Sequence, residues 1–224
     1  MNGSMRFMDR RAAGRAVADL LRTYRDRNDV VVLALPRGGV PVGYEIAKAL
    51  HAPLDVFTVR KLGVPGHEEL AMGAVASDGT YVADEELIDS LHVGREKFAT
   101  VVRAEFAELE RREAAYRDHR VRPDVRGKTI ILVDDGLATG ASMQAAIGAL
   151  RRHEPAQIVV AVPVGAPETC AQLRRIADDV VCVATPRPFY AVGIHYADFT
   201  QTTDEEVREL LLAAEMEMTR WRVA

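Results

Sequence analysis

The chain alternates between two kinds of hydrophobic pattern. Short, nearly continuous apolar runs predict strands buried on both faces, and they fall at 30–35, 54–59, 71–76, 80–83, 129–134, 157–164 and 180–184. Stretches whose apolar residues recur every three or four positions predict helices, and these fall at 10–25, 40–50, 84–91, 93–117, 141–153, 167–177 and 204–220. Because strands and helices alternate, the pattern predicts an α/β fold with a mainly parallel central sheet flanked by helices.

Three stretches depart from this alternation. Residues 61–69 are largely polar and contain glycine and proline, which predicts a mobile loop. Residues 85–126 are dense in arginine and glutamate and predict a helical insertion with a solvated outer face; one apolar stripe along it consists of Phe98, Val102, Phe106 and Leu109. Residues 186–203 are aromatic and rich in turn-forming residues, and they predict neither a helix nor a strand.

Length and charge limit the classes of function. The 224 residues suffice for a full core, and one domain over 1–224 with an embellishment is expected. The net charge of −4 offers no positive field for a nucleic acid or a membrane. No apolar run reaches the roughly 18 residues of a membrane span, and the first residues lack a signal-peptide core, so a cytoplasmic protein is expected. Cys170 and Cys182 do not form a CxxC pair and are expected to be buried.

The strand expected at 129–134 ends in two adjacent acids, Asp134 and Asp135. Adjacent carboxylates repel each other, so the pair predicts an opposing cation or a set of hydroxyl donors. Small residues follow before a helix that begins near Ala141, where backbone N–H groups with the hydroxyls of Thr139 and Ser142 predict a phosphate cradle. No lysine follows the glycine, so this is not a Walker A loop, and there is no GxGxxG dinucleotide motif. The combination predicts a ligand with a diol or metal beside a phosphate.

This segment resembles the signature of the type I phosphoribosyltransferases: an apolar strand, two acids, three small or apolar residues, Thr-Gly, one residue, then Ser or Thr. The resemblance implies the fold of that family, with a small hood, and binding of 5-phosphoribosyl 1-pyrophosphate (PRPP). It assigns the ribose hydroxyls to Asp134 and Asp135 and the 5-phosphate to 138–142. The ligand-binding loop as a whole is Gly136, Leu137, Ala138, Thr139, Gly140, Ala141 and Ser142.

Two further segments resemble the pyrophosphate side of such a site. Arg37, Gly38 and Gly39 follow the first expected strand, where a guanidinium and bare backbone N–H groups suit an anion, and they resemble the pyrophosphate loop of the family. Arg60 and Lys61 open a segment that resembles the mobile loop of adenine phosphoribosyltransferases. The resemblance implies that these cations face the leaving pyrophosphate. The catalytic residues it implies are Asp134, Asp135, Arg37 and Lys61.

The acceptor is left open because two resemblances disagree. Family members that act on 6-oxopurines carry an acid directly before the Thr-Gly of the loop, where this chain has Ala138, as adenine enzymes do. The turn at 36–39 instead resembles that of xanthine-guanine enzymes. Residues 186–203 are expected to form the hood over the base, with Phe189, Tyr190 and Val192 as contacts; plain packing of this region against the sheet is the alternative. No side chain stands out as a general base.

The function implied by the resemblance is transfer of phosphoribosyl from PRPP to a nucleobase, a purine for preference, or to a related heterocycle, with release of pyrophosphate. Magnesium is expected to arrive with the substrate, with Asp134 and Asp135 as the acids available to it and no dedicated protein metal site. A non-catalytic sensor that binds the sugar pyrophosphate or a nucleotide is the alternative function. A phosphatase is disfavoured because no nucleophile follows the acids.

The resemblance covers about 7–212 and is to an uncharacterised bacterial group of predicted phosphoribosyltransferases. It implies a homodimer. The inserted helices at 85–126 are expected to form either a dimer interface or a fixed wall over the site.

Overall fold

The computed structural model describes residues 6–77, 79–117 and 122–223, and its centre is a parallel sheet of five strands. The strands lie in the order β2-β1-β6-β7-β8. In chain order they are β1 (Val30–Ala34), β2 (Leu54–Val56), β6 (Thr129–Val133), β7 (Gln157–Val164) and β8 (Asp179–Ala184). Their side chains are buried on both sides of the sheet over most of their length, so uniform apolar runs predicted these strands well.

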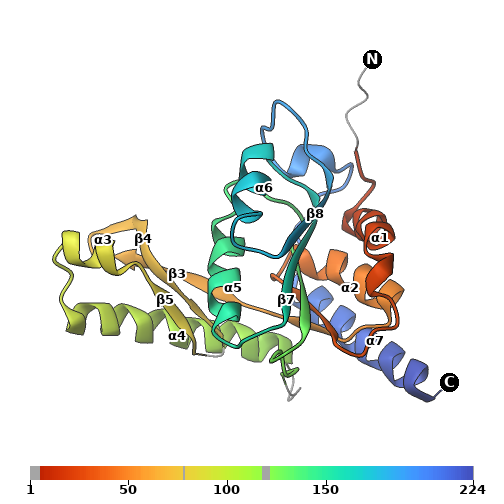
Figure 1. Ribbon diagram of the computed structural model, residues 1–224, viewed down its shortest axis with the longest axis horizontal. Coiled ribbons are helices and arrows are strands. Elements are labelled where there is room, and N and C mark those ends of the chain that lie inside the picture. The colour runs from red at the N-terminus through yellow and green to blue at the C-terminus, as the bar shows by residue number, and fades with distance from the viewer. Residues whose placement is uncertain (1–5, 78, 118–121, 224) are drawn as a thin grey trace.

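Helices cover both faces of this sheet (Figure 1). Alternate strand residues such as Val32 and Val31 point to opposite faces and enter different core clusters. One face packs against α1 (Arg10–Leu20), α2 (Gly39–Leu50) and α7 (Asp204–Val223). The other face packs against α5 (Ala141–Arg151) and α6 (Pro167–Leu173). Short 3-10 helices span Arg22–Tyr24 and Gly193–His195, the second of them within the hood segment expected to be irregular.

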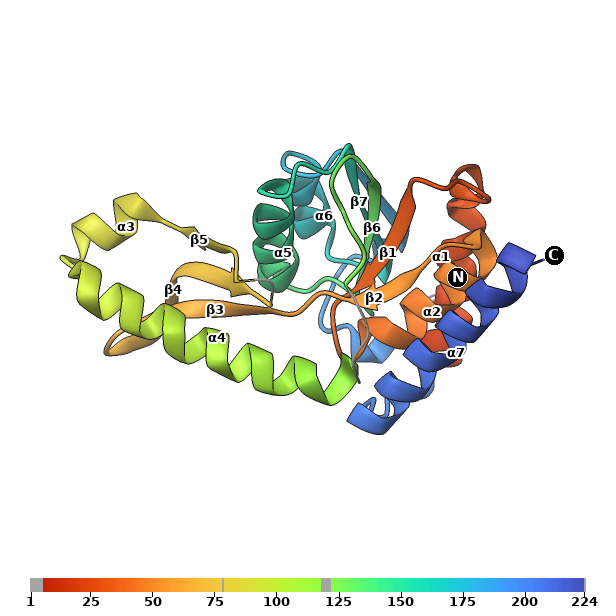
Figure 2. The same cartoon turned by 90° about the horizontal axis from the view of Figure 1, so that it is seen from below.

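A second unit extends away from the central sheet as an arm (Figures 1 and 2). Its antiparallel sheet consists of β3 (Val59–Val64), β4 (His67–Ala76) and β5 (Tyr81–Ala83). Two helices, α3 (Glu85–Ser90) and α4 (Arg95–Arg117), complete it. The apolar stripe predicted on the insertion packs against this small sheet and forms the core of the arm. The outer face of α4 carries the ion pairs of Glu108 with Arg111 and Arg112.

The arm corrects two expectations. Residues 54–59 are not one strand: β2 ends at Val56, and β3 begins at Val59 in the other sheet. Residues 61–69 are not a loop, because most of them belong to β3 and β4, which pair antiparallel around a turn at Pro65 and Gly66. Gly66 has a φ of 85°, a conformation that glycine adopts without strain. The polar composition was therefore that of an exposed hairpin.

Other expectations concern burial and membranes. Cys170 is buried and Cys182 is half-buried, and both are free thiols, as expected. Within the described parts of the chain, no helix has the length and apolar character that crossing a bilayer requires.

Candidate functional site

Two turns meet at the carboxyl edge of the central sheet, where open α/β sheets bind ligands. One follows β1 and contains Arg37, which is joined to Pro36 by a cis peptide bond; the other follows β6. The N–H of Leu35 donates to the carbonyl oxygen of Val133 at 2.8 Å. A Cβ atom at Gly39 would lie 2.8 Å from that same oxygen. The expected pyrophosphate turn and the expected ribose acids are therefore neighbours, and their close approach requires glycine.

The acid pair lies at the centre of this edge. Asp134 accepts a hydrogen bond from the N–H of Asp135 at 2.8 Å, and the Asp135 carboxylate accepts one from Nε of Arg10 at 2.8 Å. The hydroxyl of Tyr196 donates to the carbonyl oxygen of Asp135 at 2.6 Å. Burial raises the pKa of both acids, repulsion from Asp135 raises the pKa of Asp134 further, and Arg10 partly offsets the rise for Asp135. The pair is thus held in place at an electrostatic cost that a bound diol or cation would reduce.

This cost predicts that the single substitution Asp134→Asn raises stability. Because the native pKa of Asp134 is raised, the native state binds more protons than the unfolded state above the unfolded pKa of about 3.9, so stability falls as the pH rises through this range. The amide cannot ionise and still accepts from the N–H of Asp135. At pH 7 we expect a gain of about 1 kcal/mol, or roughly 2–4 °C in melting temperature for a chain of this size. Thermal melts at pH 7 and pH 4 test this: the gain should shrink at pH 4, and a lower melting temperature at pH 7 contradicts it.

The loop after the acids is fixed from below and open at its tip. The backbone of Leu137 is bridged to the end of β7: its N–H donates to Val164 and its carbonyl accepts from Ala166. The hydroxyl of Thr169 donates to the carbonyl of Ala138 at 2.6 Å. Gly140 has a φ of 71° and caps α5. The tip residues Ala138, Thr139 and Ser142 are exposed, so the N-terminus of α5 and two hydroxyls face solvent in the arrangement expected for a phosphate cradle.

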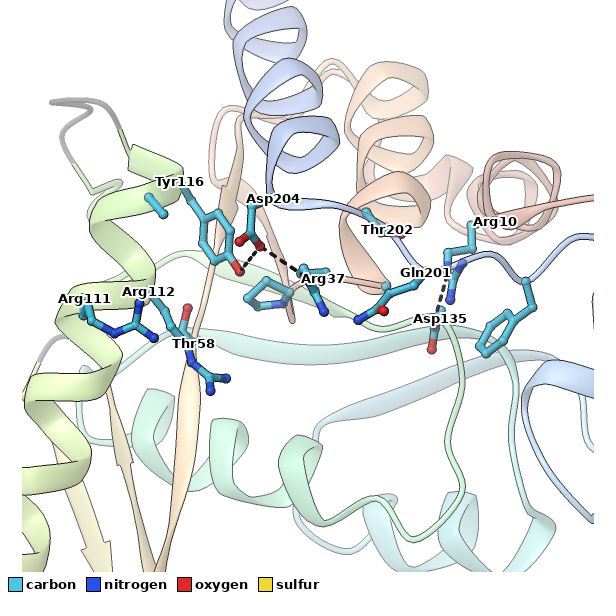
Figure 3. Close-up of a pocket in the computed structure, with 14 residues that line it drawn as sticks. Arg10, Arg37, Thr58, Arg111, Arg112, Tyr116, Asp135, Gln201, Thr202 and Asp204 are labelled. Carbon is cyan, nitrogen blue, oxygen red and sulfur yellow. Dashed lines mark hydrogen bonds and ion pairs between the residues drawn. The ribbon is translucent and has the colours of Figure 1, made fainter.

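A cavity of about 590 Å³ adjoins Asp135 on the side of the Arg37 turn. Figure 3 shows Arg10 and Asp135 at one end of it, α4 with Arg111 and Arg112 at the other, and Arg37 between them. The guanidinium of Arg37 lies 3.5 Å from the Asp204 carboxylate, which also accepts a 3.0 Å hydrogen bond from Tyr116. Burial, with that hydrogen bond, raises the pKa of Tyr116 to about 12, so the phenol stays protonated. α4 is therefore a wall of the cavity, the second of the two roles expected for the insertion.

The structure separates the other expected pyrophosphate ligands from this cavity. Arg60 lies on β3 and forms an ion pair with Glu105 of α4. Lys61 is exposed on the same strand, where it pairs in register with Ala74. Neither side chain is among the residues that line the cavity. Their predicted contact with pyrophosphate requires a movement of the hairpin and stays a prediction.

The expected hood residues also divide. Val192 packs on the loop, because a Cβ at Gly136 would lie 2.5 Å from its side chain. Phe189 stacks on His195, and the ring of Tyr190 is 78% exposed. The part of 186–203 that reaches the cavity is instead its end, with Phe199, Gln201 and Thr202. The base contacts predicted for Phe189, Tyr190 and Val192 stay predictions.

Several lining residues had no local sequence signal. Arg10 contacts Asp135 across 125 positions of the chain, and its guanidinium lies 4.0 Å from the ring centroid of Phe199. α4 places Arg111 and Arg112 at the cavity, although the sequence marked them only as members of surface pairs. These residues come together because α1 and α4 pack beside the sheet edge, which no spacing along the chain reveals. The described residues include no group of three or more His, Cys, Asp or Glu side chains placed to hold a metal ion.

The fold and the site define an α/β protein with a strand-acid-loop-helix unit for a sugar phosphate. The chain matches the family model described as phosphoribosyl transferase domain over residues 8–196. It is 46% identical over 201 residues to proteins of two Mycobacterium tuberculosis strains, CDC 1551 / Oshkosh and ATCC 25618 / H37Rv, which carry the provisional name phosphoribosyl transferase. The crystal structure of TT1426 from Thermus thermophilus is 41% identical, has a TM-score of 0.85, and is covered to 99% by 93% of this chain.

The chain belongs to the phosphoribosyl transferase family. This confirms the resemblance seen in the acid pair and its loop, and the parallel sheet with flanking helices is the expected α/β fold. The match covers 90% of this chain but 45% of the length of the Mycobacterium tuberculosis relatives, which are therefore about twice as long.

Proposed function

We propose that this chain transfers a phosphoribosyl group from PRPP to a nucleobase nitrogen and releases pyrophosphate. The observation that carries the proposal is the position of the acid pair. Asp134 and Asp135 lie between an exposed phosphate cradle at the N-terminus of α5 and a cationic turn at Arg37, all at one edge of the sheet. A ribose that bears a phosphate at one end and a pyrophosphate at the other complements this order of groups.

The chemistry follows from what each group can do. Displacement at the anomeric carbon builds positive charge on the ribose and negative charge on the departing pyrophosphate. Asp134 and Asp135 would accept hydrogen bonds from the ribose hydroxyls and offset the positive charge, while Arg37 would stabilise the pyrophosphate. The N–H groups and hydroxyls of 138–142 would anchor the 5-phosphate. The catalysis is therefore positioning and electrostatics, with no covalent intermediate on the protein.

Magnesium fits this site. Two carboxylates whose pKa values are raised by burial and mutual repulsion are hard oxygen donors that a divalent cation would relieve. Asp134 and Asp135 would contact the ion carried by the substrate, in keeping with the expectation that it arrives with PRPP. When bound, the ion neutralises charge on the pyrophosphate.

For the acceptor we propose a purine or a related heterocycle. Phe199 lines the cavity and offers an aromatic face on which a flat base can stack. Gln201 and Thr202 beside it supply side chains that can read base edges. A base held between these residues and the acid pair would lie within the same cavity as the anomeric carbon.

Pyrophosphate release tests the proposal. The protein is incubated with PRPP, magnesium and single bases from a panel of purines, pyrimidines and related heterocycles, and pyrophosphate is measured over time. The proposal predicts base-dependent release for at least one acceptor and none without PRPP. Tight PRPP binding in calorimetry, without turnover across the whole panel, would contradict it and favour a sensor. The homodimer implied by the family is a separate prediction that sedimentation equilibrium can test.

A further inference from the structure

The inserted helix α4 presents two arginines to the cavity from the side opposite the acid pair (Figure 3). Both are held by one carboxylate. Nε and a terminal nitrogen of Arg111 donate to Glu108 at 2.8 and 2.9 Å, and Nε of Arg112 donates to the same group at 2.7 Å. The two guanidiniums are therefore pre-positioned on a rigid helix.

These cations are only partly neutralised. Two guanidiniums share the single charge of Glu108, and the side chains of Arg111 and Arg112 are 70% and 51% exposed. The other carboxylates in the cavity, Asp135 and Asp204, already face Arg10 and Arg37. The cavity is thus lined by four arginines and two acids, and its surplus positive charge lies on the α4 wall. An anion is the complementary ligand.

A second observation points to a ligand at the same place. Thr58 follows β2 and lines the cavity beside the two arginines. The residue is only 8% exposed, and among the residues that the structure describes its side-chain hydroxyl has no hydrogen-bond partner. A buried hydroxyl without a partner is costly. A phosphate oxygen in the cavity would accept its hydrogen bond.

We propose that Arg111, Arg112 and Thr58 form an anion subsite that binds the pyrophosphate group of PRPP, facing Arg37 across the cavity. This rests on the proposed function and adds to it, because the cations come from a fixed inserted helix. Arg60 and Lys61, the residues expected in this role, do not line the cavity. A pyrophosphate has two phosphate groups, so one can face the turn at Arg37 and the other the α4 wall. The acceptor side, with Phe199 and Gln201, stays free for a base.

Calorimetry with three probes tests the subsite. Dissociation constants are measured for PRPP with magnesium, pyrophosphate with magnesium, and ribose 5-phosphate, on the full chain and on the double variant Arg111→Ala/Arg112→Ala. Because charge-assisted hydrogen bonds are lost, we expect affinity for PRPP and for pyrophosphate to fall about 10-fold or more, with ribose 5-phosphate unchanged. Arg103→Ala is the matched control, since Arg103 is an exposed arginine of the same helix outside the cavity.

Unchanged pyrophosphate affinity in the double variant would overturn the subsite, and so would an equal loss for ribose 5-phosphate. If the double variant does not fold, Thr58→Val serves instead, since it keeps the shape of the side chain and removes only the hydroxyl. It is expected to weaken pyrophosphate binding several-fold with no loss of thermal stability; unchanged binding would overturn the proposal. Failure of the proposed function is distinguishable, because the unmodified chain would then bind neither PRPP nor ribose 5-phosphate.

Discussion

Exchange of Asp134 and Asp135 for asparagine together is expected to weaken PRPP binding by about 100-fold or more. Each carboxylate is placed to accept a charge-assisted hydrogen bond from the ribose, and such a bond contributes roughly 1.5–3 kcal/mol. Loss of two at the lower end costs about 3 kcal/mol, which is on the order of 100-fold in affinity. Calorimetry at pH 7 with saturating magnesium measures the change. The variant should fold, because the amide introduced at position 134 retains an acceptor for the N–H at position 135 and the repulsion between the acids is removed.

The control for this experiment is Asp19→Asn. Asp19 is exposed on α1 and pairs with Arg22, away from the sheet edge. Its substitution removes one carboxylate from the surface and is expected to leave PRPP affinity unchanged. Equal affinity in the double variant and the unmodified chain would show that the acids do not hold the ribose.

The substitution Gly38→Ala is expected to lower kcat/KM for PRPP about 100-fold with little effect on stability. Gly38 has φ −59° and ψ −32°, which alanine adopts without strain. A Cβ atom there would overlap Oδ2 of Asp135 and lie 2.7 Å from its Cγ. The end of the aspartate can move, so the fold tolerates the methyl group, but the carboxylate leaves its position between Arg10 and the ribose. Displacement of a positioning group by about 1 Å can cost 10²-fold in rate.

Gly94→Ala is the matched control for Gly38→Ala. Gly94 precedes α4, and a Cβ there would meet no atom within 4 Å. Pyrophosphate release and thermal melts on both variants separate the two effects. A melting temperature that falls sharply for Gly38→Ala, or a kcat/KM equal to that of Gly94→Ala, would mean that the Arg37 turn does not position Asp135.

The parts of the fold that sequence predicted are those whose signals are local. The central strands are buried on both faces and therefore appear as uniform apolar runs, as at 129–134 and 157–164. The ligand loop is contiguous from Asp134 to Ser142, so its acids, small residues and helix start could be interpreted together. The Arg37 turn was found for the same reason, since a strand end, an arginine and two glycines are adjacent.

The parts that sequence missed depend on contacts between distant segments. The hairpin of β3 and β4 is stabilised by pairing within the arm and packing on α4, while its polar, glycine-containing sequence is typical of loops. Arg10 and Arg112 reach the cavity because α1 and α4 pack beside the sheet edge. Neither arginine has a spacing or neighbour that distinguishes it from the many surface arginines of this chain. The charge pattern of α4 correctly predicted pairs with Glu108, yet the cavity they face was invisible along the chain.

A crystal structure of this chain soaked with magnesium and PRPP tests the central claim most directly. The account predicts a 5-phosphate at the backbone N–H groups of 138–142, ribose hydroxyls within hydrogen-bond distance of Asp134 and Asp135, and the pyrophosphate between Arg37 and α4. A sugar phosphate bound elsewhere, with both carboxylates untouched by the ribose, would contradict it.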